Sequence, residues 1–164
     1  LFGKVDFKRV RYLFLPQFAV RQALFVDSKA EKNSSVARLQ TDQTSMTVRQ
    51  MRSGQEIAEP GGLPTVVQHD DGDLLTTTVF VMYNYTEDTS GVRDLQTIDV
   101  IGLPNGFLQD HYNPTPVDNI WNAGPNAPTR GEVFRTRINL TKLRGKASWR
   151  VQTLPAVGAY GWVE

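Results

Sequence analysis

Segments that favour β-strands over helices dominate this sequence. Residues 74–85 are mostly β-branched and aromatic, and such side chains pack well on a pleated sheet. Residues 20–29 contain an uninterrupted apolar run at 23–26, which is typical of a strand buried on both faces. Residues 5–15 have a similar character and end at Pro16, so a short connection should join these two strands as a hairpin. The pattern therefore predicts a sheet-dominated fold.

Three further strands are expected, over residues 95–103, 132–140 and 149–154. The capping side chain of Asn33 predicts a short helix over residues 33–40, with Val36 and Leu39 three positions apart on one face. Two polar segments rich in turn-forming residues are expected to form loops, residues 49–73 and 110–131.

Charge is unevenly distributed along the chain, although 18 Lys and Arg against 17 Asp and Glu give a net charge of only +1. Residues 1–38 hold eight basic and three acidic residues, or +5, and residues 39–129 hold three and twelve, or −9. Residues 130–164 hold seven and two, or +5. Two basic ends could meet in one basic face that suits a nucleic acid. The alternative is that acidic loops and Arg-bearing strands merely alternate.

Several classes of protein are excluded by what the sequence lacks. The chain has no Cys, which rules out disulfides and Cys-bearing zinc sites. No apolar run approaches the roughly 20 residues of a membrane-spanning helix, so no membrane partner is expected. No glycine-rich phosphate loop follows a strand, so no nucleotide cofactor is expected. Charged residues near the start argue against a signal peptide, and 164 residues suit a single domain.

Candidate catalytic residues follow the apolar run. Residues two apart in a strand share a face, so Asp27 and Lys29 should project together while Ser28 points away. Asp6, in the preceding strand, could bring a second carboxylate close. Two carboxylates that hold Mg²⁺ and a lysine that orients water are the minimal set for metal-assisted phosphodiester hydrolysis. A surface ion pair at a strand end remains the alternative, since Asp6 and Lys8 have the same spacing.

A second candidate site lies on the strand expected at residues 132–140. Apolar or small side chains at Phe134, Thr136, Ile138 and Leu140 alternate there with Arg135, Arg137 and Asn139. Guanidinium groups pair bidentately with guanine or phosphate, and a strand that presents such a row can enter a DNA groove. A solvated face whose Arg stems cover apolar surface is the competing interpretation.

Taken in order, these segments resemble the SfiI-type type II restriction endonucleases of the PD-(D/E)xK nuclease superfamily. The resemblance covers nearly the whole chain and rests on residues 3–12 and 24–30, and most specifically on Arg-Gly-Glu-Val-x-Arg-x-Arg at 130–137. It also includes Gly62-Leu63-Pro64, Tyr112-Asn113-Pro114 and Trp149-Arg150. It implies an α/β fold with the PD-(D/E)xK restriction-endonuclease-like core, a mixed β-sheet flanked by helices. Residues 1–164 would then form a single endonuclease domain that lacks an N-terminal helical segment.

The resemblance also assigns roles to individual residues. Asp6 and Asp27 become the metal-binding carboxylates, Lys29 the catalytic lysine, and the carbonyl of Ser28 a further ligand of Mg²⁺. Where the family has a lysine before the Arg-Gly-Glu-Val motif, this chain has Pro125 with Asn126 beside it. The expected DNA contacts are Arg135 first, then Arg137 and Arg130, with Asn33 facing the minor groove and Asn126 close by.

The function implied by this resemblance is Mg²⁺-dependent cleavage of double-stranded DNA at an interrupted, GC-rich palindrome, leaving 5′-phosphate ends. A homotetramer is expected, with a dimer as the alternative, in the cytoplasm of a prokaryote. Two other functions stay open at this point. The chain could be another PD-(D/E)xK nuclease, for repair or nicking, or it could be a non-catalytic β-rich binding module.

Overall fold

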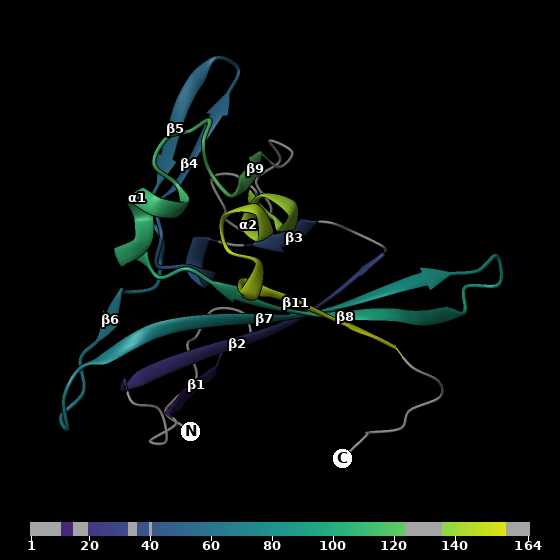
Figure 1. The fold of residues 1–164 in the computed structure, drawn as a ribbon, viewed down its shortest axis with the longest axis horizontal. Helices are drawn as coiled ribbons and strands as arrows, with labels where there is room; N and C mark the ends of the chain where they lie inside the picture. Colours follow the sequence, from purple (N-terminus) through teal and green to yellow (C-terminus); the bar gives the residue numbers. More distant parts are fainter. Residues whose placement is uncertain (1–10, 15–19, 33–35, 40, 124–135, 157–164) are drawn as a thin grey trace.

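A mixed six-stranded sheet, here called the main sheet, runs through the molecule (Figure 1). The computed structural model describes residues 11–14, 20–32, 36–39, 41–123 and 136–156. Neighbouring strands follow the order β1-β2-β7-β8-β11, and β6 pairs with the start of β7. Strands β2 and β7 are parallel, whereas every other pair is antiparallel. The strands are β1 (Arg11–Phe14), β2 (Gln22–Lys32), β6 (Val66–Val67), β7 (Leu74–Glu87), β8 (Arg93–Leu103) and β11 (Val151–Pro155).

The sequence predicts most of this sheet correctly. Strands β7 and β8 contain the segments 74–85 and 95–103, and β1 pairs with β2 as an antiparallel hairpin. Residues 1–10 lie outside the described residues, so the expected strand 5–15 is confirmed only over β1. One detail is wrong: the run at 23–26 is not buried on both faces, because buried and half-buried side chains alternate along β2.

A second, three-stranded sheet has the order β3-β10-β9 and is called the second sheet below. Its strands are β3 (Val36–Leu39), β9 (Trp121–Ala123) and β10 (Thr136–Asn139). The helix expected over residues 33–40 is therefore wrong, since residues 36–39 form a strand. Ala37 and Leu39 are buried while Arg38 is exposed, a period of two that follows from antiparallel pairing with β10.

The polar segment 49–73 contains a hairpin where only turns and loops were expected. Strands β4 (Val48–Arg52) and β5 (Gln55–Glu59) pair antiparallel around Ser53 and Gly54. Both turn residues have positive φ, 49° and 77°, as a two-residue type I′ turn requires. The hairpin extends away from the main sheet (Figure 1).

Helices are few and short in the described part of the chain. They are α1 (Gln109–Tyr112) and α2 (Leu140–Lys146), together with the 3₁₀ turns η1 (Thr41–Gln43), η2 (Gly106–Leu108) and η3 (Ser148–Arg150). The expected strand 132–140 is confirmed over β10, because residues 132–135 lie outside the described residues and α2 begins at Leu140. The expected strand 149–154 begins two residues late, at Val151. None of the described helices is long and apolar enough to cross a membrane.

The largest core cluster lies between the two sheets. The main sheet contributes Phe80, Met82 and Ile101, all fully buried, and the second sheet contributes Trp121 and Ile138. In Figure 1, α2 lies on the same side of the main sheet as the second sheet, and its Leu140 and Leu143 join the cluster. This packing fixes the second sheet and α2 against one face of β7 and β8.

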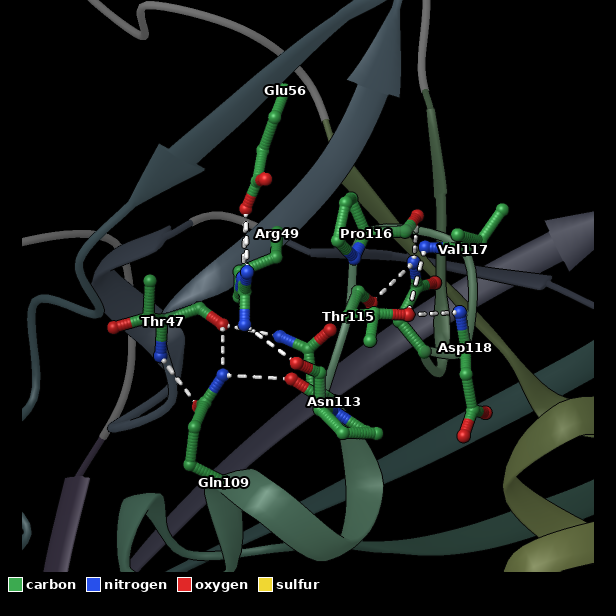
Figure 2. A network of polar contacts seen from close by, with 11 residues as sticks. Thr47, Arg49, Glu56, Gln109, Asn113, Thr115, Pro116, Val117 and Asp118 are labelled. Atoms are coloured by element: carbon green, nitrogen blue, oxygen red, sulfur yellow. Dashed lines mark hydrogen bonds and ion pairs between the residues drawn. The ribbon is translucent and has the colours of Figure 1, made fainter.

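A polar network ties the hairpin β4–β5 to the segment that follows α1 (Figure 2). The Gln109 side chain accepts from the Thr47 N–H at 3.0 Å and donates to the Thr47 carbonyl at 3.0 Å. Arg49 Nη1 donates to the carbonyl of Pro114 at 2.6 Å, and Asn113 Nδ2 also donates to Thr47. The beginning of the expected loop 110–131 is thus held by specific hydrogen bonds.

Replacing Ile101 with Ala should lower the free energy of unfolding by about 3 kcal/mol, because the side chain is fully buried between the two sheets. Ile98, on the same strand but half-buried on the opposite face, provides the control, and Ile98→Ala should cost clearly less. Urea unfolding followed by circular dichroism measures both values. If both variants lose the same free energy of unfolding, the packing of β8 in the core between the sheets does not contribute more to stability than its opposite face.

Candidate active site

Asp27 and Lys29 lie on the same face of β2, as their spacing predicts. Lys29 Nζ is 2.7 Å from Asp27 Oδ2, and Ser28 between them is exposed on the other face. Asp27 is 8% exposed, and the side chain of Lys29 is 18% exposed. The geometry rules out the surface ion pair considered above, because both charges lie largely inside the protein.

The strand beside β2 provides the environment of this pair. In the parallel register, Asp27 lies opposite Phe80 of β7 and Lys29 lies opposite Met82. The ammonium group of Lys29 is 5.3 Å from the centre of the Phe80 ring, close enough for a cation–π contact. Burying two charges costs free energy unless further hydrogen bonds satisfy them. The pair therefore needs a third polar partner.

Gln43 is that partner, and sequence reasoning missed it. Its Nε2 donates to Asp27 Oδ2 at 2.8 Å, and its Oε1 accepts from Lys29 Nζ at 3.3 Å. The residue is 3% exposed and ends the 3₁₀ turn η1, fourteen positions after Lys29. One amide thus contacts both members of the pair. No local motif marks Gln43, since only the fold brings η1 against β2.

Of the two carboxylates predicted to bind Mg²⁺, the described residues include Asp27. A carboxylate oxygen is the ligand type that Mg²⁺ prefers, and Asp27 could present one beside Lys29. Within the described ranges, no group of three or more His, Cys, Asp or Glu could hold a metal ion. Asp6, the second carboxylate of the predicted site, lies outside those ranges.

A second buried carboxylate, Asp99 on β8, has a structural environment. Its Oδ2 accepts from Asn84 Nδ2 at 2.8 Å, and its Oδ1 is 3.4 Å from Arg144 Nη2 and accepts from the Thr153 hydroxyl. Arg144 belongs to α2 and Thr153 to β11. Asp99 therefore links α2 to the main sheet through its contact with Arg144.

Among the predicted DNA contacts, the structure describes Arg137. It lies half-buried on β10 between Thr136 and Ile138, which are both buried, so the predicted alternation is confirmed here. Asn139, whose amide belongs to the same predicted face, caps α2: its Oδ1 accepts from the Lys142 N–H at 2.9 Å. The other predicted contacts lie outside the described residues: Asn33, Asn126, Arg130 and Arg135.

Gln50 of β4 forms hydrogen bonds to two strands of the second sheet, and the sequence did not predict this role. This residue is 2% exposed, and its Nε2 donates to Thr136 Oγ1 at 2.6 Å and to the carbonyl of Asn122 at 3.2 Å. These two partners are on β10 and β9, so Gln50 bonds to both strands next to Arg137. The sequence did not indicate this role because Gln50 lies in the segment 49–73, where only loops were expected.

The fold is that of the restriction endonucleases. The structure is similar to the tetrameric restriction endonuclease SfiI bound to cognate DNA, with a TM-score of 0.75 and 33% sequence identity over 96% of this chain and 62% of that one. It also resembles the restriction endonuclease BglI bound to its DNA recognition sequence, with a TM-score of 0.67 over 82% of this chain and 54% of that one. At 16% identity, BglI supports the fold alone.

The chain belongs to the family of the type II restriction enzyme SfiI. The family model matches residues 1–154. The type II restriction enzyme SfiI of Streptomyces fimbriatus is 37% identical over an alignment of 162 positions that covers 93% of this chain and 60% of that relative. The chain therefore spans three fifths of the length of the relative that it matches.

Proposed function

We propose that this chain forms the catalytic and DNA-reading part of a type II restriction endonuclease, a site-specific deoxyribonuclease. Its reaction would be the Mg²⁺-dependent hydrolysis of phosphodiester bonds in double-stranded DNA at an interrupted, GC-rich palindrome. The observation that supports this most is the buried Asp27–Lys29 pair on β2 of a chain that belongs to the SfiI family. Burying these two charges costs desolvation free energy, and a site that binds a cation beside a phosphate would make use of both charges.

Each residue of the pair has a role in this proposal. Asp27, together with Asp6 and the carbonyl of Ser28, would hold Mg²⁺, and the ion would supply positive charge that stabilises the phosphate oxygens and activates water. Lys29 is held in place by Gln43 and orients the attacking water beside the scissile phosphorus. Water adds to phosphorus and the bond to the 3′ oxygen breaks, which leaves 5′-phosphate and 3′-hydroxyl ends.

The DNA-binding and assembly parts of the proposal follow the family. Arg135 would be the first contact to base edges in the major groove, with Arg137 beside it and Arg130 and Asn126 as further contacts, and Asn33 would face the minor groove. A palindromic target suits a protein assembly with two-fold symmetry, and we propose a homotetramer, with a dimer as the alternative. The solved SfiI structure is a tetramer on cognate DNA, which supports this assembly. Residues 1–164 would fold as a single endonuclease domain in the cytoplasm of a prokaryote.

Digestion of bacterial genomic DNA, followed by sequencing of the ends, tests the proposal in one experiment. The purified protein with Mg²⁺ should cut both strands at one recurring interrupted palindrome and leave 5′-phosphates, and addition of EDTA should stop the reaction. Single-strand nicks at unrelated sequences would instead indicate a repair or nicking nuclease. Intact DNA under all conditions would contradict the proposal.

Replacing Arg137 with Ala should weaken binding to the cleaved sequence by about 10- to 100-fold, as expected for the loss of one bidentate base contact. Binding to unrelated DNA should change much less. Fluorescence anisotropy in EDTA measures both affinities without cleavage. Arg93→Ala, on the distant hairpin between β7 and β8, serves as the control, because Arg93 pairs with Glu87 there and should not affect either affinity.

A further inference from the structure

The second sheet carries a row of three polar residues that pair across its strands. Arg38 of β3 is the register partner of Arg137 of β10, and Arg137 is in turn the partner of Asn122 of β9. Directly opposed residues in antiparallel strands project from the same face, with their Cβ atoms about 5 Å apart. The three side chains therefore form one continuous row.

This row faces away from the core. Ala37 and Leu39, on either side of Arg38, are buried, and so are Thr136 and Ile138 on either side of Arg137. The side chain of Arg38 is 68% exposed. The second sheet thus places its apolar face on the main sheet and presents a basic row on the other face.

Two cations in direct cross-strand register destabilise a sheet unless negative charge compensates them. Glu31 provides part of that charge, because its Oε1 lies 3.7 Å from Arg38 Nε. Glu31 lies on β2 two positions beyond Lys29, so it shares the face of the Asp27–Lys29 pair and lies about 13 Å along the strand from Asp27. The Glu31 side chain is only 14% exposed, but the Arg38 end of the pair is open to solvent and the contact is long, so the guanidinium can exchange this carboxylate for another anion.

We propose that Arg38 binds a backbone phosphate of DNA beside the base edges that Arg137 reads, and that Glu31 holds Arg38 when DNA is absent. This inference rests on the proposed function and adds to it a contact that no motif in the sequence indicates. The guanidinium exchanges the Glu31 carboxylate for a phosphate, and two adjacent cations then face a polyanion. The contact also links DNA binding at the second sheet to the strand that carries Asp27.

Salt-dependent binding tests the proposal, because a phosphate contact contributes about one unit to the slope of log affinity against log salt. A fluorescein-labelled duplex of random sequence is titrated with protein in EDTA at several salt concentrations. Arg38→Ala should reduce the magnitude of the slope by about one, and lower affinity equally for random and cleaved sequences. Arg93→Ala removes an Arg with a comparable Glu partner, at 3.3 Å, and should leave the slope unchanged.

The role of Glu31 is tested in the same assay. Glu31→Gln should raise affinity for the random duplex roughly two- to fivefold, which corresponds to the loss of one weak ion pair that competes with the phosphate. The gain in affinity should vanish in the double variant with Arg38→Ala, because it arises only from the release of Arg38 to bind phosphate. An unchanged slope for Arg38→Ala, a loss confined to the cleaved sequence, or a gain that persists in the double variant would each overturn the assignment. Failure of the unmodified protein to bind any duplex would instead overturn the proposed function.

Discussion

Replacing Asp27 with Asn should lower the rate of DNA cleavage by at least about 10³-fold while DNA binding in EDTA is retained. Asn keeps the shape of the side chain and an oxygen that can accept from Gln43 Nε2, but it lacks the charge that a bound cation needs. A loss of this size corresponds to about 4 kcal/mol of transition-state stabilisation, in the range expected for disrupted metal-ion catalysis. Single-turnover cleavage of a supercoiled plasmid measures the rate.

A folding defect must be separated from a chemical one, because Asp27→Asn leaves the buried Lys29 without its anionic partner. The double variant with Lys29→Met removes both charges, so it should recover thermal stability and remain inactive. Asp94→Asn, an exposed carboxylate of β8, controls for general loss of acidic charge and should cleave normally. If the double variant cuts DNA, the buried pair does not carry the reaction.

Where the sequence predicted correctly, a single periodicity was sufficient. The many β-branched residues of β7 and β8 favour strands over helices. Residues two apart in a strand share a face, so the position of Asp27 and Lys29 in β2 predicts that they lie together, whatever the neighbouring strands are. Register with β7 then adds the Phe80 contact, which no local pattern contains. Local signals were thus sufficient to pair the two charged side chains.

Predictions failed where tertiary contacts override local preference. Val36 and Leu39 have helical spacing, yet pairing with β10 makes this segment a strand. The hairpin β4–β5 has little apolar patterning. Its turn at Ser53–Gly54 has positive φ angles, Arg49 donates to the carbonyl of Pro114, and Val48 packs in the core. A short stretch of sequence cannot show these outcomes. The contacts that decide them, such as β3 with β10 and Arg49 with Pro114, join residues tens of positions apart.

The polar residues that hold the candidate site were the least predictable part. Gln43 and Gln50 both lie in polar surroundings in the sequence, although each is buried in the structure. Their amides can donate and accept at once, which suits a position between two strands or between a carboxylate and an ammonium. Such roles depend on distances between elements that only folding sets.

Replacing Gln43 with Leu should reduce the single-turnover cleavage rate by about 10- to 100-fold, because each hydrogen bond to a charged group is worth about 1.5–3 kcal/mol. The amide holds Asp27 at 2.8 Å and Lys29 at 3.3 Å, so its loss leaves both free to move away from the scissile phosphate. DNA affinity in EDTA should be unchanged. Gln109→Leu removes a half-buried amide of the Figure 2 network that bonds to Thr47 and Asn113, and it should affect stability but not the cleavage rate.

Gln43→Glu separates positioning from simple packing. A Glu carboxylate can still accept from Lys29 Nζ but cannot donate to Asp27 Oδ2, and it adds negative charge beside the predicted cation site. We expect Gln43→Glu to retain more activity than Gln43→Leu and to need less Mg²⁺ for half-maximal rate, since a nearby carboxylate favours cation binding. A glutamine with only a packing role would leave the Mg²⁺ requirement of Gln43→Leu equal to that of the unmodified protein. In the proposed site Gln43 would act on the reaction through its hydrogen bonds to Asp27 and Lys29, and the Mg²⁺ titration of Gln43→Leu measures that effect.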